Sequence, residues 1–413
     1  MSLLYHLPLE MLEIIFNLCD VYTLLQLNRV CKKFHKISEN VLNKKSNHLL
    51  VTNEVSKKFC ERCTALLPSY NSKFITYYNW KYGLARKHII CHLVIDSIED
   101  MGARRMNGNR LKMTKNTVWF YDGNILSAFN RAEDGNIMGG MILGNCNCPF
   151  SSIAYCNDII ISGHVDGSIR HWRIESWKNI NNIQLLKAHS NVYDEYVSNI
   201  EVTTQNIISS SSNLIKIQKN TLEDDDSVEK KKPIYSGKNL IHSISLDPTE
   251  TKVAASTEES FLIYDINKHC KVREECIDDH TCYQLLWQDT HTILMLYEPY
   301  IKKMDIRTFE FVRTWDASVL NSDYELYSLS SDYLYTIMTG TNIGTVLLWD
   351  QRSTDCILTF NIYPILFNPV FSVEFNSTHM YAITKLDGVV EFNFKEGHYY
   401  DRAERKKYFN SFI

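Results

Sequence analysis

One pairing of residue types recurs along most of this 413-residue chain and limits the folds open to it. In each instance, a large apolar residue at the end of a β-rich run is followed by a polar one. The seven instances are Phe129-Asn130, Trp172-Arg173, Ile217-Gln218, Tyr264-Asp265, Met304-Asp305, Trp349-Asp350 and Phe392-Asn393. Successive instances lie 43, 45, 47, 40, 45 and 43 residues apart, and a period of roughly 40–45 residues is typical of four-stranded propeller blades. The sequence therefore predicts a β-propeller of seven blades.

Shorter motifs inside the repeats support this prediction. A β-rich run ending at Gly163, the turn Asp166-Gly167 and a second run ending at Trp172 follow the order strand, tight turn, strand. Gly and Asp suit a turn that needs positive φ. Only Trp349-Asp350 spells the dipeptide of WD repeats, so the period carries more weight than the signature. We expect residues 88–95 to supply the outer strand of the last blade and so to close the ring.

The first forty residues follow a helical period instead. Pro8 suits the first turn of a helix, where its missing N–H would be unpaired, and Glu10 complements the positive end of the helix dipole. Apolar residues then form two stripes, which are Leu9, Leu12, Phe16 and Cys19 on one side and Met11, Ile14, Ile15 and Leu18 on the other. A unit this small seldom buries so much apolar surface by itself. The second stripe therefore predicts a contact with another protein.

A second helical segment follows the candidate caps Asp20 and Thr23. Together, the two segments resemble the F-box over about 35 residues. The resemblance implies docking on the adaptor Skp1 of SCF-type (Skp1–cullin–F-box) ubiquitin ligases. The implied contact residues are Leu7, Pro8, Glu10, Leu12, Ile15, Phe16, Leu18, Leu24, Leu27, Val30 and Phe34. The alternative is an ordinary amphipathic helical hairpin.

Residues 41–87 remain mostly helical and lack the Gly/Ser composition of a flexible linker. With Trp80 and Gly83 in a Trp-x-x-Gly element, the whole chain resembles the F-box/WD-repeat family. We expect a mainly β protein with an α-helical N-terminus. Its parts are an F-box (1–40), a helical connector (41–87), a seven-bladed WD40-type propeller (88–394) and a C-terminal tail (395–413). His189 and His280 precede expected inner strands, where WD repeats place a structural histidine.

Composition excludes several classes of function. The net charge of −4 disfavours general nucleic-acid binding, and no apolar run is long enough to span a membrane. Pro8, Glu10 and Glu13 interrupt the apolar start of the chain, which is unlike a secretory signal. The 12 cysteines are scattered, as in reduced cytosolic proteins, and Cys60-x2-Cys63 lacks the second pair that a zinc site needs. We expect a protein of the cytoplasm, or also of the nucleus, with no metal or cofactor.

No catalytic motif is present: there is no Gly-rich phosphate loop, nucleophile elbow or His-Glu-x-x-His helix. The resemblance implies a non-catalytic substrate receptor of an SCF ligase. In that role the F-box binds Skp1 and, through it, a cullin–RING ligase, while the propeller binds the protein substrate to be degraded. The alternative is a propeller scaffold that binds Skp1 without a cullin.

The turns and loops expected on one face of the propeller predict its binding preference. The candidate substrate-binding residues there are Asp122, Asp166, Asp194, Tyr196, Glu258, Glu298, Tyr300, Tyr324 and Asp387. The family resemblance implies a phosphorylated substrate, which clustered arginines bind. This acidic rim instead predicts a basic or neutral segment. The alternative is a solvated rim whose tyrosines do the binding.

Overall fold

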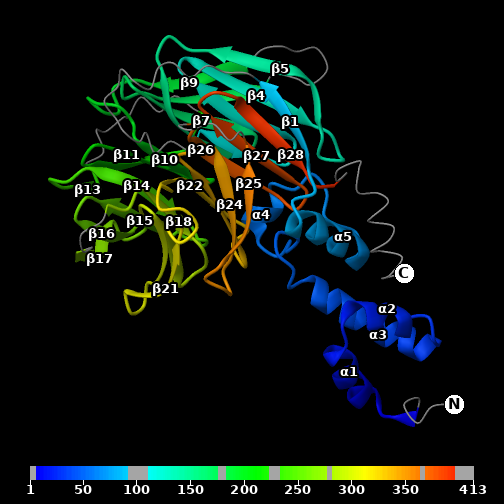
Figure 1. Ribbon diagram of the computed structural model, residues 1–413. Helices are drawn as coiled ribbons and strands as arrows, with labels where there is room; N and C mark the ends of the chain where they lie inside the picture. Colours follow the sequence, from blue (N-terminus) through cyan, green and yellow to red (C-terminus); the bar gives the residue numbers. More distant parts are fainter. Residues whose placement is uncertain are drawn as a thin grey trace.

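The computed structural model describes residues 6–91, 110–174, 183–222, 233–276, 281–362 and 368–395. It shows a ring of four-stranded antiparallel sheets from which a group of N-terminal helices projects (Figure 1). The helices are α1 (Leu9–Leu18), α2 (Val21–Leu27), α3 (Lys32–Ser46), α4 (Lys57–Cys60) and α5 (Tyr70–Lys81). The expected architecture of F-box-like helices followed by a seven-bladed propeller is therefore confirmed.

Each sheet forms one blade, and its strands follow one another in the sequence except in the last blade. Blade 1 holds β2 (Leu111–Met113), β3 (Thr117–Asp122), β4 (Ile125–Arg131) and β5 (Ile137–Asn145). Blade 2 holds β6 (Phe150–Cys156), β7 (Ile159–His164), β8 (Ile169–Ile174) and β9 (Ile183–His189). Blade 3 holds β10 (Asn199–Val202), β11 (Asn206–Ser211), β12 (Leu214–Lys219) and β13 (Tyr235–Ser236).

The remaining blades have the same arrangement. Blade 4 holds β14 (Ile241–Leu246), β15 (Lys252–Thr257), β16 (Ser260–Asp265) and β17 (Cys270–Cys276). Blade 5 holds β18 (Gln284–Trp287), β19 (Thr292–Leu296), β20 (Tyr300–Asp305) and β21 (Glu310–Asp316). Blade 6 holds β22 (Leu326–Ser331), β23 (Thr336–Thr341), β24 (Thr345–Asp350) and β25 (Cys356–Asn361). Blade 7 holds β26 (Val370–Phe375), β27 (His379–Thr384), β28 (Gly388–Asn393) and β1 (Arg86–Cys91).

The recurring residue pairs all lie in the third strand of a blade, from β4 to β28. Two of them make the hydrogen bond that ties this strand to the second one. The Trp172 indole N–H donates to Ser162 Oγ at 2.7 Å, and the Trp349 indole N–H donates to Thr339 Oγ1 at 3.1 Å. In blade 2 the neighbouring ring is His164, whose Nε2 lies 2.7 Å from Ser162 Oγ. His189 ends β9 and precedes β10, the first strand of blade 3, so its structural role there stays a prediction. His280 lies outside the described residues.

Blade 7 joins the two ends of the propeller sequence. Strand β1 pairs antiparallel with β28, with Arg86 opposite Asn393 and Ile89 opposite Val390. The closing strand thus begins two residues before the expected start at residue 88 and is described as far as Cys91. Residues 92–95 of the expected strand lie outside the described residues. Ring closure by a strand from the N-terminal side is confirmed.

The F-box helices pack around a small core. Helix α1 places Leu12 and Phe16 against α3, where Phe16 meets the ring of Phe34 edge-on at 5.3 Å between ring centroids. The carboxylate of Asp20 accepts a hydrogen bond from Thr23 N at 2.7 Å and caps α2. Helix α3 continues past the boundary that we expected at residue 40 and ends at Ser46. The helical unit is therefore longer than its sequence motif.

The connector fixes these helices to the propeller. The F-box core extends to Tyr70 and Phe74 of α5. At the other end of α5, the buried Trp80 stacks on Phe394 at 3.5 Å between ring centroids and donates its indole N–H to Ser377 O at 2.8 Å. Figure 1 shows α5 between the F-box helices and the propeller. The expectation of a packed connector, as opposed to a flexible linker, agrees with these contacts.

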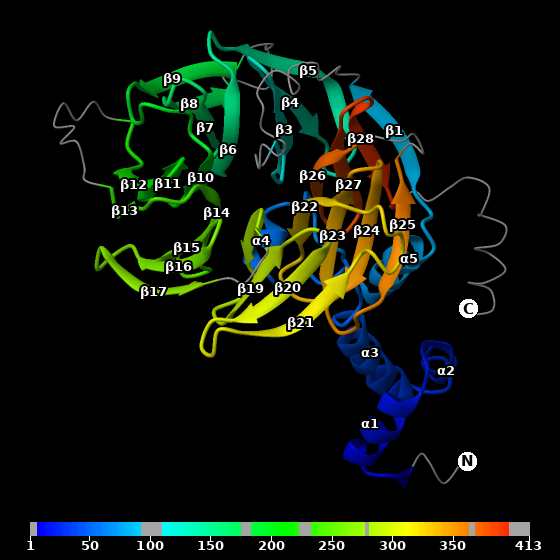
Figure 2. The same ribbon diagram turned by 60° about the vertical axis from the view of Figure 1, so that its left-hand side comes forward.

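A second part of the connector enters the ring. Helix α4 is seen at the centre of the ring in Figure 2, where Phe59 packs on Phe375 at 5.5 Å between ring centroids. Just after α4, the buried guanidinium of Arg62 lies 3.0 Å from the carboxylate of Glu374 and donates to Ser330 Oγ at 3.1 Å. These contacts fall on the side of the ring that holds the turns between first and second strands, which we term the base face. The opposite side, with the turns between second and third strands and the loops between blades, we term the open face.

Candidate functional site

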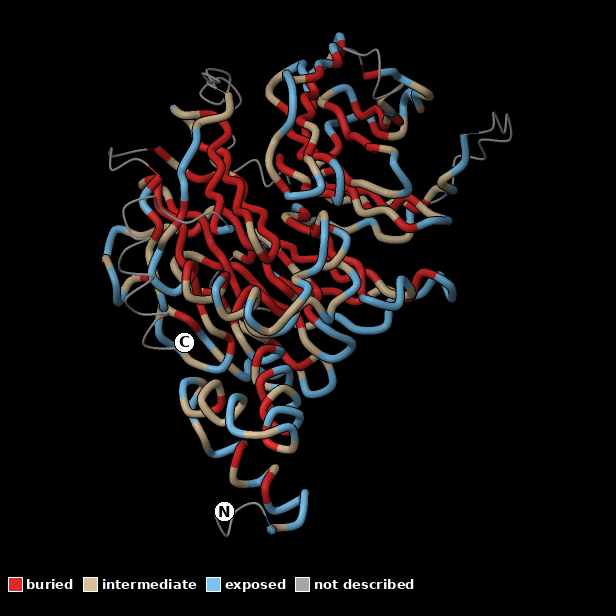
Figure 3. The backbone as a smooth tube through the Cα atoms, turned by 90° about the vertical axis from the view of Figure 1, so that its right-hand side faces the viewer, coloured by how far each residue is buried: buried red, intermediate tan, exposed pale blue. Residues whose placement is uncertain are grey.

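The outer side of α1 presents an apolar stripe. Met11, Ile14 and Leu18 are 48%, 57% and 84% exposed, and residues at this spacing lie on one side of a helix. Leu12 and Phe16 face the opposite way and are buried. Figure 3 shows exposed stretches among the helices near the N-terminus, whereas the strands of the propeller are mostly buried. The expected division of α1 into two apolar stripes agrees with the structure except at Leu9, which is exposed, and Ile15, which packs against the F-box core.

The expected Skp1-contact residues separate into two groups by burial. Leu12, Phe16, Leu24 and Phe34 are buried in the F-box core, so any effect on a partner is indirect, through the packing of the helices. Leu7, Ile15 and Leu27 are half-buried, whereas Pro8, Glu10, Leu18 and Val30 are exposed. Only the exposed and half-buried side chains are available for direct contact. The surface includes further apolar residues that the expected set lacks, which are Leu9, Met11, Ile14 and Tyr22.

The helical period already indicated Met11 and Ile14, because both belong to the second stripe. Leu9 and Tyr22 had no such signal. Leu9 falls on the stripe with Leu12, yet it is 50% exposed. It lies in the first turn of α1 and outside the core that α1 forms with α3. The helical pattern alone could not distinguish the exposed Leu9 from the buried Leu12.

All of the expected substrate-binding residues lie on the open face, away from the connector. Asp122, Asp166, Glu258, Glu298, Tyr300 and Asp387 lie in or beside the turns between second and third strands. Asp194, Tyr196 and Tyr324 lie in loops between blades. They are distributed over blades around the ring and do not converge on one point. Two of the carboxylates interact with neighbouring side chains of the propeller itself. Asp166 forms an ion pair with Arg170 at 3.0 Å, and Asp387 accepts a hydrogen bond from the Asn368 side-chain amide at 2.9 Å.

Three of these residues lie in a turn of blade 5 and in the loop that leads from blade 5 to blade 6. Glu298 and Tyr300 flank the turn before β20, and Tyr324 lies in the loop from residue 317 to residue 325. A backbone hydrogen bond from Ala317 N to Pro299 O, at 3.2 Å, joins this turn and this loop. This bond continues the pairing of β20 with β21 in blade 5, where Tyr300 lies opposite Asp316.

The open face carries an excess of carboxylates in its described turns and loops. The acidic residues between strands are Asp166, Asp194, Glu195, Glu258, Glu259, Glu298, Asp323, Glu325 and Asp387. The basic residues in the same described segments are Arg110, Lys238 and Lys385. Arg110 is buried, with its guanidinium 4.9 Å from the ring centroid of Phe371. The described part of this face therefore favours positively charged partners.

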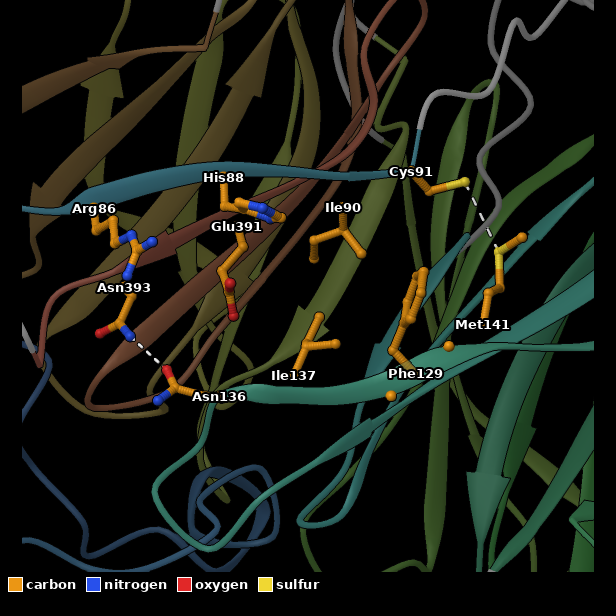
Figure 4. A pocket seen from close by; sticks show the side chains of 12 residues that line it. Arg86, His88, Ile90, Cys91, Phe129, Asn136, Ile137, Met141, Glu391 and Asn393 are labelled. Atoms are coloured by element: carbon orange, nitrogen blue, oxygen red, sulfur yellow. Dashed lines mark hydrogen bonds between the residues drawn. The ribbon is translucent and has the colours of Figure 1, made fainter. Parts of the chain in front are cut away.

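A groove of about 480 Å³ lies where the ring closes, between β1 and β5 (Figure 4). Polar side chains gather at one end, where the Asn393 amide donates to Asn136 Oδ1 at 2.7 Å. Apolar side chains such as Ile90 and Phe129 line the other end. Burial raises the pKa of Glu391, whose carboxylate accepts a hydrogen bond from the Tyr381 hydroxyl at 2.7 Å. This hydrogen bond ties the groove to the core of blade 7.

The cysteine pair of the connector has structural partners. Cys60 Sγ donates to Glu54 O at 3.1 Å, and Cys63 Sγ lies 3.7 Å from Ser377 Oγ. Burial raises the pKa of Cys63 to about 11, which keeps it a thiol. Within the described ranges, no group of three or more His, Cys, Asp or Glu side chains has an arrangement that could hold a metal ion. No helix in these ranges is long and apolar enough to cross a membrane.

Comparisons with known proteins match the two parts of the chain separately. The F-box domain model matches residues 4–46, and no curated protein matches the sequence. The WD40 β-propeller domain of Doa1 aligns with a TM-score of 0.55 and 12% identity, over 75% of this chain and 96% of that one. A chain of the mitotic checkpoint complex aligns with a TM-score of 0.57 and 12% identity, over 74% of this chain and 93% of that one.

A third structure supports the same fold. Raptor from Chaetomium thermophilum aligns with a TM-score of 0.55 and 15% identity, over 67% of this chain and 27% of that one. At these identities, the likeness establishes the fold alone. The chain thus joins an F-box domain to a seven-bladed WD40-type propeller, a combination that fits an F-box/WD-repeat protein.

Proposed function

We propose that this chain is the substrate-recognition subunit of an SCF (Skp1–cullin–F-box) ubiquitin ligase. The F-box binds Skp1, and through it a cullin–RING ligase, while the propeller binds the protein substrate. The observation that carries this proposal is the exposed stripe of Met11, Ile14 and Leu18 on the F-box. Exposed apolar patches of this kind mark protein contacts.

The connector is consistent with Skp1 binding by the F-box and substrate binding by the propeller. Helix α5 shares the F-box core through Tyr70 and Phe74 and is anchored under blade 7 by Trp80. Arg62 and Glu374 join the connector to the base face, which leaves the open face for a substrate. A receptor of this form contributes no catalytic group. It raises the effective concentration of the substrate beside the ligase.

Finer points of the proposal rest on the sequence. Among F-box/WD-repeat proteins, the chain most resembles dactylin, on the Trp80-x-x-Gly83 element, the degenerate repeats and the final blade. We expect the protein in the cytoplasm, or also in the nucleus, and its substrate is directed to the proteasome.

Affinity purification of the full chain tests the proposal. We expect Skp1 and a cullin to co-purify with the wild type. Leu18→Glu, at an 84% exposed position of the stripe, should lose both partners, whereas the control Val55→Glu, at a 73% exposed position of the connector, should retain them. Capture of Skp1 without a cullin would favour the non-ligase scaffold. Capture of neither by the wild type would reject the proposed ligase function.

A further inference from the structure

The open face carries its own exposed apolar site. In the loop from residue 317 to residue 325, between β21 and β22, Val319 is 80% exposed and Leu320 is 46% exposed. Among the large apolar side chains of the described residues, only Leu18 of the F-box exceeds Val319 in exposure. The most exposed apolar positions therefore lie on the F-box and on the open face, the two places where this molecule meets partners in the proposed function.

Hydrogen bonds hold the 317–325 loop in place. At its start, the Asp316 carboxylate accepts from Ser318 N at 2.8 Å. At its end, the Asn342 side chain of blade 6 donates to Asp323 O at 2.9 Å and accepts from Glu325 N at 3.2 Å. The exposed pair is thus presented on an ordered loop. An ordered loop loses little conformational entropy when it binds a partner.

Carboxylates occur in and next to the loop that carries this apolar pair. Asp323 and Glu325 belong to the loop, Asp316 precedes it, and Glu298 lies in the turn that bonds to Ala317. No Lys or Arg occurs in the sequence between residues 314 and 327 or between residues 295 and 301. Tyr300 and Tyr324 add aromatic surface beside the same turn and loop. The turn and the loop themselves therefore combine apolar surface with carboxylates and contain no Lys or Arg. The nearest lysine in the same blade is Lys302 of β20, whose ammonium lies 5.0 Å from the ring centroid of Tyr297.

The basic residues of the open face lie in other blades. Arg110 precedes β2 of blade 1, Lys238 lies between blades 3 and 4, and Lys385 lies in a turn of blade 7. A phosphate group at the 317–325 loop would meet carboxylates without a neighbouring cation from these loops. A phosphorylated residue carries close to two negative charges at neutral pH, and like charges placed together oppose binding.

We propose that the 317–325 loop, with Glu298, binds an unphosphorylated substrate segment in which an aliphatic or aromatic side chain is flanked by Lys or Arg. The apolar side chain packs on Val319 and Leu320, and the flanking cations pair with Glu298 and Asp323. Phosphorylation of the segment weakens its binding. This inference rests on the proposed function, because it names the substrate class of the propeller.

A peptide array probed with the full chain in complex with Skp1 tests the inference. The array holds 12-residue peptides centred on Leu in three matched series, with flanking Lys/Arg, flanking Gln, or flanking Lys/Arg with phosphoserine beside the Leu. We expect the basic series to bind best and the phosphorylated series to bind several-fold more weakly. Binding of the basic series should also fall several-fold as salt rises from about 50 to about 300 mM, because charges near the surface are screened. Preference for the phosphorylated or the neutral series would overturn the inference.

Variants assign the effect to this loop. Val319→Ser with Leu320→Ser should reduce binding of every series by roughly tenfold. Glu298→Gln with Asp323→Asn should remove only the advantage of the basic peptides. The control, Glu195→Gln with Glu259→Gln, changes the same charge in loops of other blades on the open face and should leave the ranking intact. An unchanged ranking in the Glu298 and Asp323 variant would refute the inference.

The outcomes also separate this inference from the proposed function. Skp1 capture by each variant is measured in the same preparations, since the F-box lies on the other side of the propeller. Intact Skp1 and cullin capture with no preference among the peptides would refute the substrate class alone. If the wild type does not capture Skp1, the ligase assignment is refuted, whatever the array shows.

Discussion

Replacing both Ile14 and Leu18 by Ser should weaken Skp1 binding to the F-box without unfolding the F-box. Both side chains lie on the outer stripe of α1, where they are 57% and 84% exposed. Neither belongs to the buried core that α1 forms with α3. Substitutions at such exposed positions change the free energy of unfolding by about 0.5 kcal/mol or less. Any large loss of binding therefore reports on the interface.

The exposed fractions set the expected size of that loss. Full burial of an aliphatic side chain stabilises a complex by about 1.5–3 kcal/mol. Scaled by the fractions that remain open in the free chain, the two side chains together account for about 2–4 kcal/mol. This corresponds to a rise in the Kd for Skp1 of roughly 30- to 700-fold.

Leu12→Ala provides the contrast, because this side chain is fully buried in the F-box core. Its removal should cost about 2–5 kcal/mol of stability and weaken binding only through loss of the folded helices. Isothermal titration with purified Skp1 and thermal unfolding of each variant distinguish the two cases. A Kd for the Ile14 and Leu18 variant within threefold of the wild type, with an unchanged melting temperature, would refute the assignment of this stripe as the docking surface.

Three further predictions concern the connector and the propeller. Trp80→Ala should lower the free energy of unfolding by about 3–5 kcal/mol, since it removes a buried ring that stacks on Phe394; urea unfolding measures this, and a loss below 1 kcal/mol would contradict it. Arg62→Met should cost about 3–5 kcal/mol because it leaves Glu374 buried without its partner, and adding Glu374→Leu should recover part of that loss in the same assay. Burial lowers the pKa of His379 to about 3 and that of His164 to about 4, so only the unfolded chain takes up these protons as the pH falls below about 6.5. Stability should then drop by up to about 1.4 kcal/mol per pH unit for each histidine, and equal melting temperatures at pH 7.5 and 5.5 would exclude this linkage.

Local periodicity in the sequence was enough to predict the architecture. Each blade is a run of neighbouring strands, so its marker pair recurs at a nearly constant interval, from Phe129-Asn130 to Phe392-Asn393. The two stripes of α1 were predictable for the same reason, because a helix brings residues three, four and seven apart to one side. The closing strand was also indicated, within two residues of its observed start at Arg86.

Only the tertiary structure decided which elements far apart in the sequence meet. It placed Arg62 against Glu374, and Trp80 against Phe394. It also separated the buried Leu12 from the exposed Leu9, which one stripe had grouped together. Periodicity describes the sides of one helix or strand, whereas these contacts depend on how the ring closes and on where the connector enters it. That geometry is set by packing over the whole molecule, so no local pattern in the chain contains it.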